Sequence, residues 1–217
     1  MTVAIIRFAG TNCDFDMEYA YNKIGVKTQY IWHKDSSLPS GIDLVVLPGG
    51  FSYGDYLRSG AIARFSPIMN AVVEFANKGG RVLGICNGFQ ILLEAGLLKG
   101  AMKRNENLHF ISKHQELEVV NNNNRFLNPY KQGDKINIPI AHAEGNYYCL
   151  EDDLKELEDK NLILLKYINN PNGSLEDIAG ICNENKNVFG LMPHPERAME
   201  KPLGSDDGVL MLRSLLG

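Results

Sequence analysis

The sequence predicts an α/β fold with a mainly parallel central sheet, helices on both faces and a small antiparallel excursion. Two observations support this prediction. Short apolar runs that fit buried strands alternate with segments whose apolar residues recur at helical spacing. Glycine and proline turns separate these segments. This alternation implies right-handed crossovers between parallel strands, with helices packed on both faces of the sheet.

The first half of the chain shows the alternation most clearly. Residues 3–8 form an apolar run, and Asp14 can N-cap a helix over residues 15–24 that Gly25 ends. Further elements are expected in the same order: strands at 27–32 and 44–47, a helix that Ser66-Pro67 opens and Gly79 closes, a strand at 81–85 and a helix at 87–95.

Between residues 98 and 140 the chain becomes charged and rich in asparagine. Residues 115–120 and 135–140 resemble antiparallel strands, and the polar run 121–124 between them is expected to be a loop. This is the predicted antiparallel excursion on the surface. The remaining elements are expected as a helix at 152–160, strands at 162–167, 178–182 and 188–192, and a last helix from 205–207 to 216.

Length and composition narrow the class of protein. A chain of 217 residues with 44% apolar and 22% charged residues fits one globular domain, residues 1–217. A formal net charge of −4 without a Lys/Arg cluster argues against a nucleic-acid partner. No run approaches the roughly 18 apolar residues of a membrane helix, and no leader is evident, so no membrane partner and a cytoplasmic location are expected. Four widely spaced cysteines predict neither disulfides nor a metal site.

Cys86 lies where the predicted strand 81–85 meets the predicted helix 87–95. Gly84 and Gly88 stand two residues to either side of it. This pattern is typical of a nucleophile elbow, a strained strand-to-helix turn at which only small neighbours fit. The N–H groups and dipole of the following helix favour a thiolate. A buried structural cysteine is the alternative, but the flanking glycines favour catalysis.

His194 and Glu196 follow the predicted strand 188–192, in the sequence Pro-His-Pro-Glu. Ligands of open α/β sheets bind beyond the carboxyl ends of the strands, where this segment and Cys86 both fall. A cysteine nucleophile needs a base and a third group to orient that base. The prolines fix the backbone, and the i, i+2 spacing places both side chains on one face. We therefore predict a Cys86–His194–Glu196 triad.

Further residues are expected to surround this triad. The backbone N–H of Asn87 is expected to stabilise an oxyanion, because it points toward the sulfur from the start of the predicted helix. Gly50, in the glycine pair after the strand 44–47, is the natural second donor, because an N–H that approaches a ligand closely tolerates little side chain. His142 and Glu144 repeat the His-x-Glu spacing without the fixed turn, so His142 is expected to be a pocket residue.

Two motifs resemble those of the class I (triad) glutamine amidotransferases: Gly-Ile-Cys-Asn-Gly-Phe-Gln at 84–90 and Pro-His-Pro-Glu at 193–196. Within this class, residues 7–14, 48–55 and 142–145 resemble the small glutaminase subunits of phosphoribosylformylglycinamidine synthase. The resemblance covers nearly the whole chain. Many members of the class have Leu or Tyr after the nucleophile, whereas this chain has Asn87, as in the purine branch.

The resemblance implies hydrolysis of L-glutamine. Cys86 would form a γ-glutamyl thioester, His194 would protonate the departing ammonia and then activate water, and Glu196 would orient His194. It also implies a set of residues around the substrate: Phe51, Gln90, His142, Glu144 and Gly145.

The resemblance further implies partners in purine (IMP) biosynthesis. Ammonia would pass to a larger synthetase subunit, which uses ATP and Mg²⁺ to convert phosphoribosyl-formylglycinamide to its amidine, and a small accessory subunit would join the complex. This chain has neither a phosphate-loop motif nor a Gly-x-Gly-x-x-Gly turn after a strand, so no cofactor is expected in it.

Two other functions fit part of the pattern. A cysteine hydrolase or stress protein with the same sheet would carry its histidine directly after the nucleophile, where this chain has Asn87. A non-catalytic regulatory or scaffold subunit would keep the fold but would not need all three triad residues. The rate of thiol alkylation distinguishes such a non-catalytic subunit from an enzyme, because a structural cysteine reacts slowly.

Overall fold

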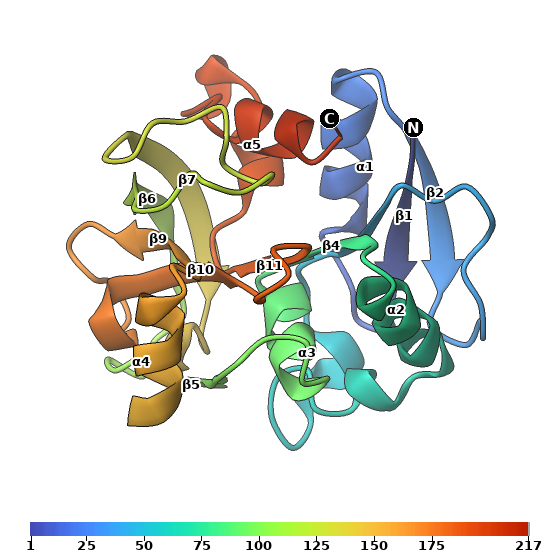
Figure 1. Cartoon of the computed structure of the whole chain (residues 1–217), viewed down its shortest axis with the longest axis horizontal. Helices are drawn as coiled ribbons and strands as arrows, with labels where there is room; N and C mark the ends of the chain where they lie inside the picture. The colour runs from blue at the N-terminus through green and yellow to red at the C-terminus, as the bar shows by residue number, and fades with distance from the viewer. Residues whose placement is uncertain (217) are drawn as a thin grey trace.

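The computed structural model describes residues 1–216 and is built around a nine-stranded sheet (Figure 1). The strand order is β2-β1-β3-β4-β11-β10-β9-β6-β7. The first five of these strands are parallel to one another. They are β2 (Lys27–Trp32), β1 (Thr2–Arg7), β3 (Leu44–Leu47), β4 (Arg81–Ile85) and β11 (Val188–Leu191).

The other half of the sheet is antiparallel. Its strands are β10 (Ile178–Cys182), β9 (Ile163–Tyr167), β6 (Ile111–Val119) and β7 (Lys135–His142). A separate two-stranded antiparallel sheet joins β5 (Ala101–Lys103) to β8 (Asn146–Tyr148). The predicted fold class, a parallel centre with a small antiparallel addition, is confirmed.

The position of β6 and β7 differs from the surface excursion expected from the sequence. Both strands continue the central sheet, because β6 pairs with β9 and places Leu117 opposite Tyr167. Leu117 and Val119 are buried, whereas the alternating neighbours Glu116 and Glu118 are exposed. The alternation therefore reflects a strand with one face on the core.

Helices cover both faces of the sheet (Figure 1). On one side lie α1 (Asp14–Lys23) and α5 (Gly208–Ser214), and on the other lie α2 (Pro67–Asn77) and α3 (Asn87–Glu94). Helix α4 (Glu151–Asp159) accompanies the antiparallel half. Short 3-10 helices complete the chain: η1 (Ser52–Asp55), η2 (Ala63–Phe65), η3 (Leu175–Asp177), η4 (Pro195–Arg197) and η5 (Lys201–Leu203). β3 is buried along its whole length, as a strand covered on both faces must be.

The start of α1 differs in detail from the expected cap. Asp14 is the first helical residue, and Cys13 occupies the cap position without a side-chain cap bond. The Asp14 carboxylate instead lies 2.5 Å from Nε of Arg7, whose guanidinium stacks 3.8 Å from the centre of the Tyr30 ring. An ion pair with a neighbouring strand has therefore replaced the local capping bond.

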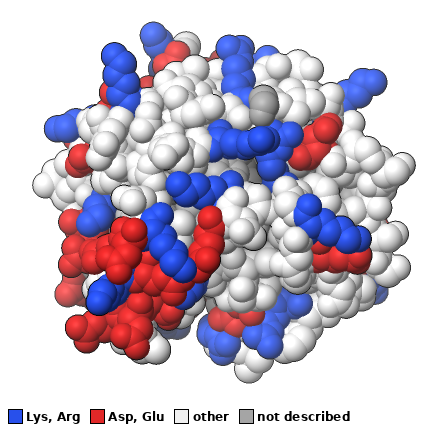
Figure 2. Space-filling model, viewed as in Figure 1, with Lys and Arg blue, Asp and Glu red and all other residues white. Residues whose placement is uncertain are grey.

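Acidic side chains gather over α4 on the face shown in Figure 2. Glu151, Asp152 and Asp153 occupy the first turn of this helix, and Lys99 lies 3.2 Å from Asp153. Negative charge at a helix N-terminus is favourable, so this patch stabilises α4. None of the helices within residues 1–216 has the length and apolarity needed to cross a bilayer.

Candidate active site

Cys86 occupies a sharp turn between β4 and α3, as the elbow pattern predicts. Its backbone has φ 50° and ψ −108°, a conformation that costs energy in a residue with a side chain. Two glycines let α3 approach the sheet. A Cβ at Gly88 would overlap the carbonyl oxygen of Leu47, and one at Gly84 would lie 2.7 Å from the carbonyl oxygen of Gly88. The surrounding packing therefore fixes the cysteine in its strained turn.

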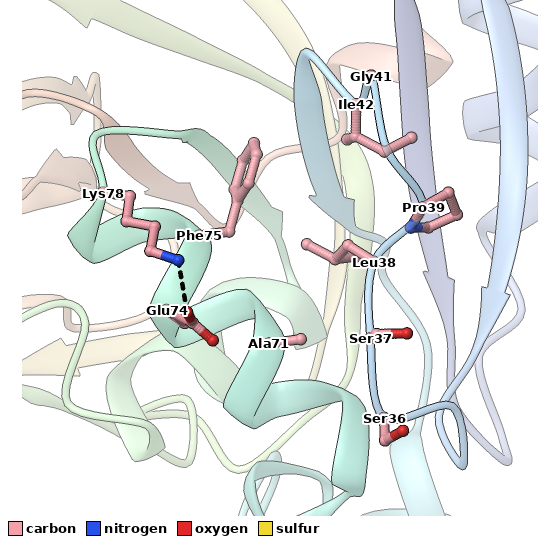
Figure 3. Close-up of a pocket in the computed structure, with 10 residues that line it drawn as sticks. All are labelled: Ser36, Ser37, Leu38, Pro39, Gly41, Ile42, Ala71, Glu74, Phe75 and Lys78. Carbon is pink, nitrogen blue, oxygen red and sulfur yellow. Dashed lines mark hydrogen bonds and ion pairs between the residues drawn. The ribbon is translucent and has the colours of Figure 1, made fainter.

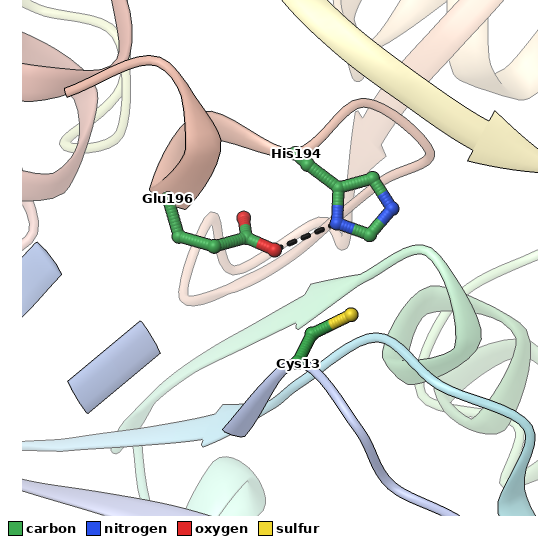
Figure 4. A group of neighbouring side chains, drawn as sticks. All are labelled: Cys13, His194 and Glu196. Atoms are coloured by element: carbon green, nitrogen blue, oxygen red, sulfur yellow. Dashed lines mark hydrogen bonds and ion pairs between the residues drawn. The ribbon is translucent and has the colours of Figure 1, made fainter. Parts of the chain in front are cut away.

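His194 and Glu196 lie together on the segment after β11 (Figure 4). His194 Nδ1 is 2.6 Å from Glu196 Oε1, and both side chains are buried. The N–H of His194 donates to the carbonyl oxygen of Pro139, at 2.8 Å. Cys86 and His194 line one cavity of about 100 Å³. The structure thus brings all three predicted triad residues to one place.

The two buried histidines near Cys86 differ in charge. Burial alone would lower the pKa of His194, but the negative charges of Glu196 and Cys86 outweigh it and raise this pKa well above its ordinary value. Burial and the charge of His194 lower the pKa of His142 to about 4. These opposite shifts favour the protonated, proton-donating form of His194 and keep His142 neutral at neutral pH.

A second cysteine, Cys13, lies beside His194 and Glu196 (Figure 4). Cys13 Sγ is 3.1 Å from Nη2 of Arg197, and burial raises the pKa of this thiol. Within residues 1–216, Cys13, His194 and Glu196 form the one group whose donor atoms are close enough to share a metal ion, within 4.8 Å. Because Nδ1 of His194 and the Glu196 carboxylate already bond to each other, a hydrogen-bonded pair accounts for this arrangement.

Cys86 also lines a second cavity, of about 60 Å³. It shares Gly50, Phe51 and Ala141 with the first cavity. Gln90, His142 and Glu144 also line it, as predicted, together with Asp55, Ser59 and Ala143, which were not. Gly145 lines neither cavity: a Cβ there would overlap the His142 ring, so this glycine leaves room for the imidazole.

Asn87 does not line this second cavity but bonds to Gln90, which does. Its side-chain oxygen accepts the N–H of Ser52 at 3.1 Å, and its amide nitrogen donates to Gln90 Oε1 at 2.9 Å. Gln90 in turn donates to the carbonyl oxygen of Glu144, at 2.6 Å. The backbone N–H of Asn87 belongs to the first turn of α3, whose donors have no acceptor within the helix.

Gly50 brings a second loop close to the cysteine. Its φ is +150°, and a Cβ there would lie 2.8 Å from Cα of Thr11. Only glycine fits this close approach between two loops. Gly50 lines both cavities next to Cys86, where a backbone donor to the substrate was expected.

Cys13 and Asp55 were not predicted as site residues, although the sequence carried a signal for both. Cys13 lies beyond the carboxyl end of β1, and Asp55 lies beyond the carboxyl end of β3. These ends share the sheet edge with Cys86. Cys13 contacts Arg197 and Asp55 contacts Asn87, so each contact joins segments far apart in the chain. The periodic pattern of apolar residues does not reveal such contacts.

A wider hollow of about 390 Å³ lies between residues 36–42 and α2 (Figure 3). Apolar side chains of Leu38, Ile42 and Phe75 face one another there, beside an ion pair between Lys78 and Glu74 at 2.5 Å. It shares no lining residue with the two cavities at Cys86, and its lining includes no cysteine or histidine. The chemistry of the site therefore centres on Cys86.

Known proteins resemble this chain over nearly its whole length. Residues 1–205 match the model of the CobB/CobQ-like glutamine amidotransferase domain. The chain is 65% identical to phosphoribosylformylglycinamidine synthase subunit PurQ of Campylobacter jejuni, over 100% of this chain and 96% of that protein. It is 62% identical to the same subunit of Wolinella succinogenes, over 99% of each chain.

Solved structures give the same picture. A chain in the structure of PurLQS from Thermotoga maritima superposes with a TM-score of 0.91 and 44% identity, covering 99% of this chain and 97% of that one. A glutamine amidotransferase of Thermotoga maritima, 19% identical, shares the fold with a TM-score of 0.66, over 100% of this chain and 96% of that one. This chain therefore belongs to the PurQ family of phosphoribosylformylglycinamidine synthase subunits, within the glutamine amidotransferases.

Proposed function

We propose that this chain acts as a single amidotransferase domain that hydrolyses L-glutamine to glutamate and ammonia, with Cys86 as the nucleophile. One observation carries the proposal. Cys86 stands on a strained turn and shares a cavity with His194, whose Nδ1 is held 2.6 Å from the buried Glu196 carboxylate. A nucleophile, a base and an orienting carboxylate are the parts that acyl transfer requires.

The first half of the reaction releases ammonia. The Cys86 thiolate attacks the γ-carbonyl carbon, and the carbonyl oxygen becomes an oxyanion that the N–H groups of Asn87 and Gly50 stabilise. His194 then gives its proton to the amide nitrogen. The C–N bond breaks, ammonia leaves, and a γ-glutamyl thioester remains on the sulfur.

The second half restores the enzyme. His194, now neutral, takes a proton from a water molecule as that water attacks the thioester carbon. The C–S bond breaks, glutamate leaves, and the thiolate and the imidazolium form again. Glu196 stabilises the imidazolium of His194 at both ends of the cycle, in agreement with the raised pKa of that ring.

We further propose that the chain works within a larger assembly. Its relatives are named as subunits of phosphoribosylformylglycinamidine synthase, and the structure from Thermotoga maritima is of PurLQS. By this likeness a larger synthetase subunit binds ATP and Mg²⁺ and uses the ammonia, and a small accessory subunit completes the complex. The four cysteines are free, which fits a cytoplasmic location.

The Cys86→Ala variant tests this proposal in the assembled enzyme. Glutamine-dependent synthesis should fall about 10⁴-fold or more, because the nucleophile is lost. Synthesis from added ammonium chloride should continue at the wild-type rate, because the synthetase does not use the sulfur. Cys182→Ala, which removes a buried thiol of β10, is the matched control and should keep both activities. Loss of both activities in Cys86→Ala would contradict the division of labour.

A further inference from the structure

The Glu196 carboxylate holds the His194 ring at one atom only. Nδ1 lies 2.6 Å from Glu196 Oε1, whereas Nε2 is buried and has no hydrogen-bond partner within residues 1–216. A ring that is held at one atom can still tilt about that bond. A second contact is therefore needed to keep Nε2, which carries the transferred proton in the proposed reaction, directed toward Cys86.

Cys13 lies along the open edge of this ring. Its sulfur, a ring nitrogen of His194 and a carboxylate oxygen of Glu196 all lie within 4.8 Å of one another. A Cβ at Gly49 would lie 2.7 Å from Cε1 of His194 and 3.0 Å from Cys13 Sγ, so the sulfur and the Cε1 edge of the ring face the same glycine. Figure 4 shows the Cys13 side chain directed toward the ring.

Two hydrogen bonds fix the Cys13 sulfur in this place. Nη2 of Arg197 donates to the sulfur at 3.1 Å, and the thiol donates to Oδ1 of Asn12 at 3.3 Å. Arg197 is anchored in turn, because its Nε donates to Asp16 on α1 at 3.0 Å. Since the thiol proton is directed to Asn12, a sulfur lone pair remains for the His194 side.

The titratable groups that face His194 and Cys13 come from several segments: Glu196 and Arg197 on η4, Cys86 at the elbow and His142 on β7. Burial lowers the pKa of His194, but Glu196, Cys86 and Cys13 raise it, and the net effect is a rise well above the ordinary value. Burial raises the pKa of Cys13 as well, which keeps this thiol neutral. A neutral sulfur is a weak, polarisable acceptor, so it can stabilise an imidazolium without taking up its proton.

We propose that Cys13 is a positioning residue for the proton transfer: its neutral sulfur faces the Cε1 edge of His194, stabilises the imidazolium and keeps Nε2 directed toward Cys86. The inference rests on the proposed glutaminase function. Cys13 acts through His194 and not on the amino-acid end of the substrate, because it lines the cavity of His194 but not the cavity of Gln90 and Glu144. Carboxylate and sulfur thus hold the ring from two sides.

Three substitutions, each made in the complex with the synthetase, separate the sulfur as an acceptor from the sulfur as a space-filling atom. Cys13→Ala removes both properties, Cys13→Ser keeps an acceptor, and Cys13→Val keeps volume without an acceptor. The kcat for glutamine hydrolysis should fall about 10-fold in Cys13→Ala and Cys13→Val but less than about threefold in Cys13→Ser, because a misdirected imidazole slows proton transfer. KM should change by less than about twofold in all three, because the cavity of Gln90 and Glu144 is untouched.

The pH dependence gives a readout that a loss of packing alone would not move. The value of kcat/KM falls at high pH, where His194 of the free enzyme loses its proton. Cys13 is one of the groups that raise the pKa of His194, so this alkaline limb should move to lower pH by about half a unit or more in Cys13→Ala and Cys13→Val. It should stay in place in Cys13→Ser. Cys182→Ala removes a buried thiol from β10 and is the matched control, with kcat and alkaline limb as in wild type.

The outcomes separate the two proposals. If the wild-type complex hydrolyses glutamine and Cys13→Ala keeps both its kcat and its alkaline limb, the role of Cys13 is wrong and the glutaminase function stands. If Cys13→Val restores activity and Cys13→Ser does not, the sulfur only fills space and the role is equally wrong. If the wild-type complex does not hydrolyse glutamine, the proposed function itself fails. The comparison of Cys13→Val with Cys13→Ser decides the question if Cys13→Ala does not fold.

Discussion

At the scale of single residues, the environment gives chemically identical side chains different roles. His194 and His142 are both buried, yet the pKa of one is raised and that of the other is lowered. The difference lies in the partner, because His194 faces the Glu196 carboxylate and His142 bonds to the neutral amide of Asn105 at 3.1 Å. A charged partner thus decides which imidazole can donate a proton.

Glu196→Gln should lower the pKa of His194, because the negative charge that opposes the effect of burial is removed. NMR titration of the His194 Cε1 proton measures this shift directly. The variant should retain about 10- to 100-fold more glutaminase activity than His194→Ala, since an orienting residue costs less than the base. Glu118→Gln, an exposed change on β6, is the control. An unchanged His194 titration would remove Glu196 from this role.

The pair of His194 and Glu196 also makes the stability of the fold depend on pH. The pKa of His194 is higher in the folded protein than its ordinary 6.5, so its proton stabilises the fold below pH 6.5. That contribution is lost as pH rises through the folded-state pKa. Glu196→Gln should therefore reduce the pH dependence of stability in this range.

The grouping of Cys86, His194 and Glu196 was accessible from sequence because its signals are local. Glycines flank Cys86, and two prolines fix the backbone around His194, two residues before Glu196. The place of Asp55 beyond a strand end was accessible, but its environment was not, because burial and the charge of the distant Glu144 raise the pKa of this carboxyl. Side chains that acquire their function only through contacts between distant segments leave no periodic pattern.

At the scale of elements, the packing of α3 against the sheet holds Cys86 in its turn. A Cβ at Gly88 would overlap the carbonyl oxygen of Leu47, a backbone atom in β3 that cannot rotate away. Helix propensity alone favours alanine over glycine by about 1 kcal/mol. The two effects have opposite signs, so a substitution at this position shows which one dominates.

Gly88→Ala should destabilise the protein by about 3 kcal/mol, because overpacking outweighs propensity. Gly96→Ala is the matched control: Gly96 has φ +71° and nothing within 4 Å of its missing Cβ, so it should cost only about 1 kcal/mol of backbone strain. Urea denaturation gives both values. A stabilised Gly88→Ala variant would show that β3 and α3 can separate without cost.

Long elements were predicted from sequence and very short ones were not. β5 and β8 have three residues each, too few for an alternation to be recognised. The alternation over 115–120 and 135–140 identified two strands, but it carried no information on their neighbours. Only the pairing of β6 with β9 places them in the central sheet.

At the scale of the whole molecule, apolar side chains surround the mouth of the site. Phe51 and Phe110 line its cavities although they are 45% and 51% exposed, and Tyr56 and Leu57 project further, at 74% and 88%. Such a cluster is typical of a docking surface. We predict that loops 10–14, 51–59 and 142–148 contact the synthetase subunit.

Adding the synthetase and its nucleotide should raise glutamine turnover by at least about tenfold, or roughly 1.4 kcal/mol of transition-state stabilisation, because docking orders these loops around Cys86. Leu57→Asp should reduce this activation and weaken the complex, measured by sedimentation and by ammonia release. Leu203→Asp, at a 67% exposed leucine in η5, is the control. Full turnover by the chain alone would contradict partner gating while leaving the triad intact.

The two cavities that Cys86 lines also determine the order in which the two products leave the enzyme. On the proposed mechanism, the amino-acid end of the glutamyl group stays in one cavity while the thioester forms and breaks. Only small molecules then exchange on the His194 side: ammonia departs there, and water arrives there. Ammonia is therefore the first product and glutamate the last, so added glutamate should compete with glutamine for the free enzyme.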